Sequence, residues 1–178
     1  MTLQKLKNTL KKEWSSCGID QGDTLLLHSD CTRILWEFRK EGITPQIILD
    51  VFLEILGHQG TLLLPTFNFN FCDQVPFSIS TTPSQMGILS EIARLKMTPK
   101  RSKHPVYSFV AFGKDADIYN AINNNSAYEE ISPFGILKQN NAKIALLDLN
   151  DQKGMTFYHH IEESLQVPYR YFKTFSAD

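Results

Sequence analysis

Apolar residues recur along the chain at two different periods, and these periods predict alternating helices and strands. In residues 2–16, leucines and a tryptophan are spaced three or four apart with lysines between them, which is typical of an amphipathic helix. A second helical pattern starts at Thr44-Pro45, where threonine can cap the helix and proline suits its first position, and it ends at Gly57. Further helices are predicted over residues 84–95, 114–122 and 156–164.

Short apolar runs between these helices predict buried strands. They cover residues 23–29, 60–65, 107–112 and 143–149. Strands that alternate with helices favour a layered α/β fold. Aromatic and polar residues alternate over residues 67–77, which predicts a strand or the wall of a cleft. The chain shows no internal repeat and no linker, so we predict one domain over residues 1–178.

The composition indicates which kinds of partner and which cellular compartment to expect. The chain has 178 residues, 42% hydrophobic composition and a net charge of -1, which gives no reason to expect nucleic acid. Its longest apolar runs are too short to span a bilayer, and its lysine-rich start lacks the apolar region of a signal peptide. Cys17, Cys31 and Cys72 are odd in number and have no CxxC spacing. We therefore expect reduced thiols in a cytoplasmic protein, with no membrane contact.

His104 is the first candidate for chemistry. It lies between a basic cluster, Arg101 to Lys103, and an apolar strand, and Pro105 follows it directly. Proline fixes its own φ and biases the preceding residue toward extended geometry, so His104 should be held in a stiff segment. A histidine fixed in this way is suited to act as a general base near neutral pH.

Polar residues also follow three of the predicted strands. His28-Ser29 follows the first strand, Thr66 the second, and Asn150-Asp151 the fourth. In open α/β sheets, ligands bind outside the carboxyl ends of the strands, so this position favours a binding role. A histidine at a strand end can equally have a purely structural role, and both interpretations of His28 stay open.

A second histidine cluster, residues 159–163 (HHIEE), lies on the last predicted helix. His159 and Glu162 are three residues apart and share a face. Three interpretations stay open: a solvated ion pair, half of a metal site, and a contact between Glu162 and His104 that would orient the imidazole. Because the pattern is not HExxH and no cysteine pair or carboxylate triad lies nearby in sequence, we expect no metal.

Several common nucleotide-binding and nucleophile motifs are absent from the sequence. It contains no GxxxxGK[ST], no GxGxxG after a strand and no GxSxG. Residue chemistry by itself therefore predicts an α/β protein with a histidine–carboxylate site.

The order of short motifs along the chain adds to this reading. The motifs are 28–29 (HS), 60–67 (GTLLLPTF), 82–87 (TPSQMG), 101–105 (RSKHP) with 108–109 (SF) and 113–114 (GK), 132–135 (SPFG), 156–159 (TFYH) with Glu162, and 167–170 (VPYR). In this order they resemble the aminoglycoside 3-N-acetyltransferase family, also called the antibiotic acetyltransferases. Each motif alone is weak, whereas seven in the right order are specific.

The resemblance implies a fold, a reaction and a set of site residues. The fold is a three-layer α/β/α sandwich distinct from the GNAT fold. The reaction transfers an acetyl group from acetyl-coenzyme A, without a metal, to a primary amine of an aminoglycoside or amino sugar. The motifs map the catalytic residues onto His104, as base or as part of a base relay, and onto His159 and Glu162. Residues implied to bind coenzyme A or the acetyl oxygen are His28, Ser29, Asp30, Cys31, Thr32, Arg33, Thr66 and Ser108.

The chain also departs from the family pattern. Family members usually run well beyond the VPYR motif, so we expect the domain to be incomplete at its C-terminal end. Residues 30–36 (DCTRILW) replace small residues and glycines, which leaves the acceptor open between an antibiotic and an amino sugar of a surface polysaccharide. The alternative hypothesis is a catalytically incomplete coenzyme A-binding domain without turnover. A homodimer is compatible with either hypothesis.

Overall fold

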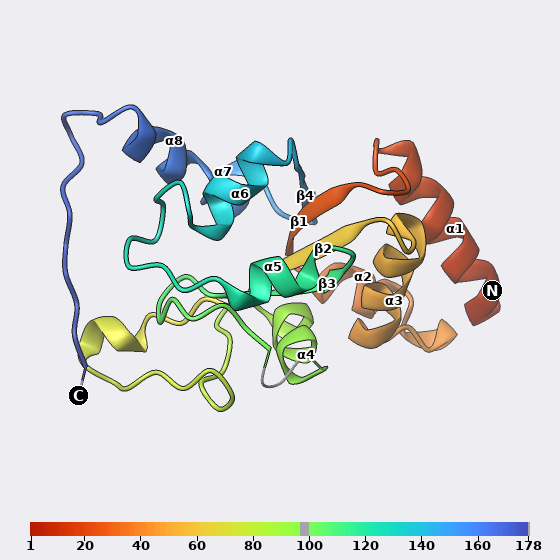
Figure 1. Cartoon of the computed structure of the whole chain (residues 1–178). Helices are drawn as coiled ribbons and strands as arrows, with labels where there is room; N and C mark the ends of the chain where they lie inside the picture. Colours follow the sequence, from red (N-terminus) through yellow and green to blue (C-terminus); the bar gives the residue numbers. More distant parts are fainter. Residues whose placement is uncertain (97–99, 178) are drawn as a thin grey trace.

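The computed structural model describes residues 1–96 and 100–177, and a four-stranded mixed sheet lies at its centre (Figure 1). The strand order is β3-β2-β1-β4. The strands are β1 (Thr24–Ser29), β2 (Thr61–Pro65), β3 (Phe109–Gly113) and β4 (Lys143–Leu147). β1 pairs in parallel with both β2 and β4, while β3 runs antiparallel to β2. The carboxyl ends of β1, β2 and β4 therefore share one edge of the sheet.

Helices cover both faces of this sheet. Alternate strand residues point to opposite sides, so Leu25 and Leu27 join one core while Leu26 joins the other. The first core packs under α1 (Leu3–Ser16), α3 (Pro45–Leu56) and α4 (Ile88–Lys96). The second packs under α5 (Ala116–Ala121) and α6 (Pro133–Gln139). This arrangement confirms the predicted three-layer α/β/α sandwich.

Local sequence signals explain where the longer elements begin and end. The Thr44 hydroxyl accepts from the Ile47 amide at the start of α3, with proline at the first position as predicted. The predicted helix over 84–95 begins only at Ile88, because Gly87 has a φ of +88° and breaks the helical path. β4 ends at Leu147, before Asp148 with its φ of 57°.

Short elements were not predicted from the sequence. These are α2 (Thr32–Glu37), α6, α7 (Asp151–Gly154) and two 3-10 helices, η1 (Arg39–Glu41) and η2 (Asn70–Asp73). Each spans too few residues for a helical period to stand out. η2 lies in the aromatic segment that was predicted to form a strand or a cleft wall.

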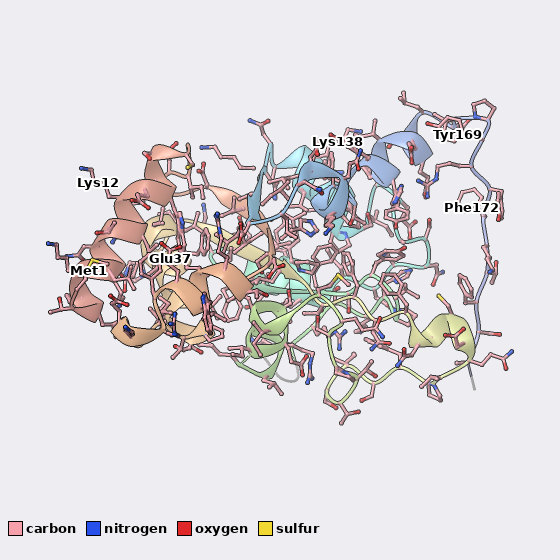
Figure 2. All side chains as sticks on the ribbon, turned by 180° about the vertical axis from the view of Figure 1, so that it is seen from behind. Met1, Lys12, Glu37, Lys138, Tyr169 and Phe172 are labelled. Atoms are coloured by element: carbon pink, nitrogen blue, oxygen red, sulfur yellow. The ribbon has the colours of Figure 1, made fainter. Side chains whose placement is uncertain are left out.

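The chain beyond α8 (Tyr158–Ser164) turns and then runs as an extended tail past the loops to the region of η2 (Figure 1). Tyr169 and Phe172 lie on this stretch, and both side chains are exposed (Figure 2). Among the residues that the structure describes, no helix is long and apolar enough to cross a membrane.

Candidate active site

A cavity of about 1270 Å³ opens between the loop around His104, the 124–130 loop, α8 and the C-terminal tail. Four carboxylates contribute to its lining: Glu129, Glu130, Glu162 and Glu163. Aromatic rings from the segments around Phe69 and Tyr107 form another part of the wall. The predicted cleft wall in residues 67–77 is thus found in the structure, and the cavity combines apolar surface with negative charge.

His104 lies in the wall of this cavity and is 8% exposed. Its Nδ1 accepts hydrogen bonds from the backbone amides of Val106 at 3.2 Å and Tyr107 at 2.9 Å. A nitrogen that accepts two amide hydrogens carries no proton, so the neutral ring holds its hydrogen on Nε2. Burial lowers the pKa of His104 to about 4. This geometry makes Nε2 of the neutral ring a hydrogen-bond donor, and the role of His104 as a base stays a prediction.

His159 and Glu162 meet on α8. Nδ1 of His159 lies 3.0 Å from Oε2 of Glu162, as the three-residue spacing predicted. The hydrogen bond to His159 and then the contact with Arg170 lower the pKa of Glu162, so its carboxyl group is ionised near neutral pH. When Nδ1 donates to this carboxylate, the lone pair of Nε2 is free to accept a proton. In that tautomer, the pair has the arrangement that a general base requires.

In the structure, Glu162 forms its hydrogen bonds with residues other than His104. Glu162 bonds to His159, to Arg170 and, at 3.3 Å, to the hydroxyl of Tyr169. His104 and Glu162 both line the cavity, while Nδ1 of His104 accepts from two backbone amides and the ring also has a hydrogen bond with the backbone of Asn125. The structure thus brings the two residues to one cavity in separate roles.

Thr66 and Ser108 meet as well, but inside the protein. Both are 0% exposed, and their hydroxyl oxygens lie 3.2 Å apart. Nε of Arg101 donates to Thr66 Oγ1 at 3.1 Å and to Ser108 Oγ at 2.8 Å, and its Nη1 donates to the carbonyl of Thr82 at 2.6 Å. These bonds enclose both hydroxyls, so neither faces a ligand as the sequence analysis expected.

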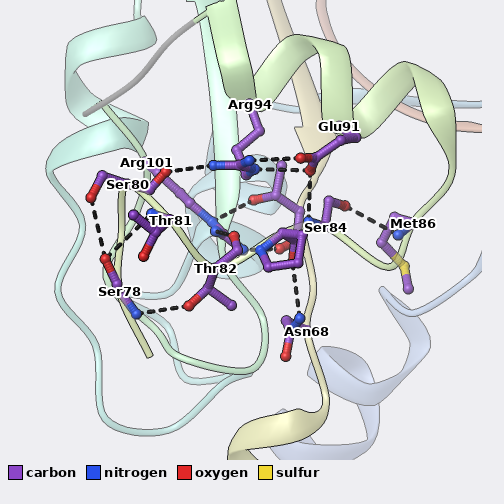
Figure 3. A network of polar contacts seen from close by, with 12 residues as sticks. Asn68, Ser78, Ser80, Thr81, Thr82, Ser84, Met86, Glu91, Arg94 and Arg101 are labelled. Carbon is purple, nitrogen blue, oxygen red and sulfur yellow. Dashed lines mark hydrogen bonds and ion pairs between the residues drawn. The ribbon is translucent and has the colours of Figure 1, made fainter. Parts of the chain in front are cut away.

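A second arginine extends this buried network. Arg94 binds both carboxylate oxygens of Glu91, at 2.8 and 2.6 Å, and donates to the carbonyl of Ser80 (Figure 3). Burial lowers the pKa of Arg101 to about 10, and the charge of Arg94 adds to this effect. Together the two arginines hold the loop that leads into α4 against the sheet.

The predicted coenzyme A segment, residues 28–33, occupies the carboxyl end of β1 and the start of α2. His28 is buried, burial lowers its pKa to about 4, and its Nε2 has no hydrogen-bond partner among the described residues. Cys31 belongs to the first core, and burial raises its pKa to about 11, which makes it a thiol at neutral pH.

The remaining residues of this segment are more open. Asp30 and Thr32 are exposed, and the Asp30 carboxylate accepts from the Thr32 amide at 2.9 Å, while Ser29 is half-buried. Arg33 is exposed and forms an ion pair with Asp148 at 3.0 Å. None of residues 28–33 belongs to the lining found for the cavity around His104.

Two contributors to the site were missed by sequence reasoning. Arg170 contacts both His159 and Glu162, and the ring of Tyr128 packs against His159 with 5.3 Å between ring centroids. The VPYR motif contains the arginine, but nothing in its spacing indicates that the side chain folds back onto α8. Within residues 1–96 and 100–177, no group of three or more His, Cys, Asp or Glu residues is placed to hold a metal ion.

A sequence model of the aminoglycoside 3-N-acetyltransferase family matches residues 26–177. The chain belongs to this family. It is 28% identical over 195 residues to YokD, an SPbeta prophage-derived aminoglycoside N(3')-acetyltransferase-like protein of Bacillus subtilis strain 168, with 95% of this chain and 68% of YokD covered. Aminoglycoside N(3)-acetyltransferase IV of Salmonella sp is 26% identical over 155 residues, with 85% of this chain and 56% of the relative covered.

Solved structures confirm the family fold. The apoenzyme of AAC(3)-IVa matches with a TM-score of 0.78 and 24% identity, covering 96% of this chain and 65% of the enzyme. AAC-IIIb in a binary complex with CoASH matches with a TM-score of 0.73 and 23% identity, covering 88% of this chain and 64% of that structure. Sisomicin-bound AAC-VIa matches with a TM-score of 0.69 and 22% identity, and it also covers 88% of this chain and 64% of that structure. The chain therefore spans about two thirds of each of these structures.

Proposed function

We propose that this chain transfers an acetyl group from acetyl-coenzyme A to a primary amine of an aminoglycoside or amino sugar. The observation that carries the proposal is the 3.0 Å contact between His159 and Glu162 beside a cavity with a carboxylate lining. Family membership supports the reaction class, and a relative solved with CoASH supports the donor. No metal is needed for this chemistry.

The role of the base follows from the state of the acceptor. An alkylammonium is protonated at pH 7 and cannot attack a carbonyl, so a base must take its proton. Nε2 of His159 accepts this proton while Glu162 stabilises the imidazolium that forms. The amine nitrogen then bonds to the acetyl carbon, the carbon–sulfur bond breaks, and coenzyme A leaves as a thiolate that takes up the proton which the nitrogen loses on becoming an amide.

In this proposal, His104 donates a hydrogen bond, whereas His159 accepts a proton. The acetyl oxygen becomes negative as the amine attacks, and a fixed donor stabilises it. The Nε2–H of His104 is such a donor when the acetyl oxygen replaces the backbone of Asn125 as its partner, because the Nδ1 contacts hold the tautomer and burial keeps the ring neutral. This assignment replaces Thr66 and Ser108, whose hydroxyls are enclosed.

The charge of the cavity fits a cationic acceptor. Glu129, Glu130 and Glu163 line the cavity together with Glu162, the partner of the proposed base, and carboxylates attract polyamines. A relative solved with sisomicin supports an acceptor of this class. For the donor, the exposed residues Thr32 and Arg33 remain the predicted contacts of coenzyme A beyond β1.

The test has two steps with the 178-residue chain. Calorimetric titration with acetyl-coenzyme A should give one saturable site per chain. Thiol release is then measured with a panel of aminoglycosides and amino sugars. His159→Gln should lower kcat by roughly a hundredfold, the usual contribution of a general base, and Glu162→Gln should lower it less. Equal turnover of His159→Gln and the wild-type chain would refute the base assignment.

A second candidate is a coenzyme A-binding domain without turnover. The observation that favours it is the coverage, since the chain spans 68% and 56% of the two relatives. Saturable donor binding without thiol release for any amine in the panel would support this candidate. Failure of a folded sample to bind acetyl-coenzyme A would count against both.

A further inference from the structure

Arg170 reaches both members of the pair on α8. Its Nη1 lies 2.6 Å from Nδ1 of His159 and also contacts Oε2 of Glu162. The guanidinium lies over the ring of Tyr128, 5.4 Å from its centroid, and the same ring packs against His159. Although Arg170 comes eight residues after Glu162, it thus contacts Nδ1 of His159, the ring nitrogen whose protonation defines the tautomer.

The two contacts at Nδ1 have opposite requirements. A guanidinium only donates hydrogen bonds, so the contact with Arg170 is a hydrogen bond when Nδ1 carries no proton. An ionised carboxylate only accepts, so the contact with Glu162 is a hydrogen bond when Nδ1 carries one. Nδ1 cannot satisfy both partners, and the tautomer selects between them.

The distances favour one of the two tautomers. At 2.6 Å, Arg170 is closer to Nδ1 than the carboxylate oxygen of Glu162, which lies at 3.0 Å. Two donors at such a short distance would repel each other, so Nδ1 accepts and the ring hydrogen lies on Nε2. In this state Nε2 has no free lone pair and cannot take a proton from an amine.

We propose that Arg170 sets the tautomer of His159, and that in the free chain it holds this histidine in the form that cannot act as a base. The inference rests on the proposed function only in calling His159 the base. When the guanidinium turns away from Nδ1, Nε2 releases its proton to water and Nδ1 takes one from water, so the exchange is balanced. Nδ1–H then donates to Glu162 and Nε2 is free.

The surroundings of the pair support this role. Within residues 1–96 and 100–177, the other charged and titratable groups that contact His159 or Glu162 are Arg170, Tyr128 and Tyr169. Among the described residues, neither tyrosine forms a hydrogen bond to the ring nitrogens, so Arg170 and Glu162 are the competing partners of Nδ1. Arg170 also lines the cavity, so a ligand that binds there meets the guanidinium directly.

The experiment reads the tautomer without any need for turnover. Long-range proton–nitrogen correlation spectra of the ¹⁵N-histidine-labelled chain at pH 8 distinguish protonated from unprotonated ring nitrogens, and His159→Gln identifies the signals. We expect an unprotonated Nδ1 in the wild-type chain. In Arg170→Met we expect the Nδ1 signal to move to the position of a protonated nitrogen. Lys12→Met removes a cation from α1, at the other end of the molecule, and should leave both signals in place (Figure 2).

Two results would overturn the proposal: a protonated Nδ1 in the wild-type chain, or the wild-type tautomer in a folded Arg170→Met variant. Circular dichroism establishes folding, and Arg170→Ala replaces the methionine variant if that one does not fold. Absence of thiol release from the wild-type chain would remove the proposed function and leave the tautomer result valid. Thiol release with an unchanged tautomer would remove the inference and leave the function valid.

Discussion

Replacing Ser108 by alanine separates a structural from a catalytic role for this hydroxyl. Ser108 Oγ accepts from Nε of Arg101 at 2.8 Å and donates to the carbonyl of Thr66 at 3.0 Å. A hydrogen bond to a charged group contributes about 1.5–3 kcal/mol and a neutral one about 1 kcal/mol. The substitution therefore removes these two bonds and the 3.2 Å contact with Thr66 Oγ1 from a fully buried position.

Neither partner of Ser108 loses all its hydrogen bonds, which limits the cost. Nε of Arg101 retains Thr66 Oγ1 at 3.1 Å, and the Thr66 carbonyl retains Nη2 of Arg101. We therefore expect Ser108→Ala to lower the free energy of unfolding by about 1–2 kcal/mol. For a chain of this length that is a loss of roughly 2–8 °C in Tm. Arg101→Met removes every bond of the guanidinium and should cost more.

Urea denaturation gives the change in stability, and thiol release by the folded protein gives the change in turnover. Ser108→Ala should lose stability while its kcat stays within about threefold of wild type, because a buried hydroxyl does not reach the thioester. An oxyanion donor would behave in the opposite way, since removing one usually lowers kcat by about 100-fold or more. A large loss of kcat with unchanged stability would refute the buried assignment.

The remaining predictions concern acid stability and a backbone contact. Burial lowers the pKa of His28 and of His104 to about 4, below the value of 6.5 for an unfolded histidine, so the unfolded chain binds more protons between these two values. The free energy of unfolding should therefore fall as pH decreases from 6.5 toward 4, and urea titrations of His28→Gln should show a smaller pH dependence than wild type. Gly113 has a φ of +103°, and a Cβ there would overlap the carbonyl oxygen of Gly60, so Gly113→Ala should cost about 2 kcal/mol or more. A Gly113→Ala variant with wild-type stability in thermal denaturation would contradict the register of β2 and β3.

Much of the fold could be predicted from the sequence, because its signals are local. The leucine runs of β1 and β2 and the amphipathic pattern of α1 lie within single elements, and the Thr44-Pro45 cap fixes the start of α3. α2 and α7 escaped prediction because they contain six and four residues. Their helical form depends on the packing and turns around them rather than on a periodic pattern.

The candidate site was predictable only in part, for a related reason. The spacing of His159 and Glu162 on one helix predicted their contact, since three residues span almost one turn. The polar character of Thr66 and Ser108 suggested a ligand site, but a buried arginine distant in sequence takes up both hydroxyls. Contacts across 35 and 7 residues leave no mark on local spacing.

His104 and His159 show how environment assigns different chemistry to the same side chain. His104 is 8% exposed, and two backbone amides fix the proton of its ring on Nε2. The side chain of His159 is 46% exposed and contacts two charged partners, so its tautomer can change and its protons can exchange with water. A donor to a developing negative charge must not exchange its role during turnover, whereas a base must gain and lose a proton in every cycle. The fixed ring is therefore suited to the acetyl oxygen and the adjustable ring to the amine.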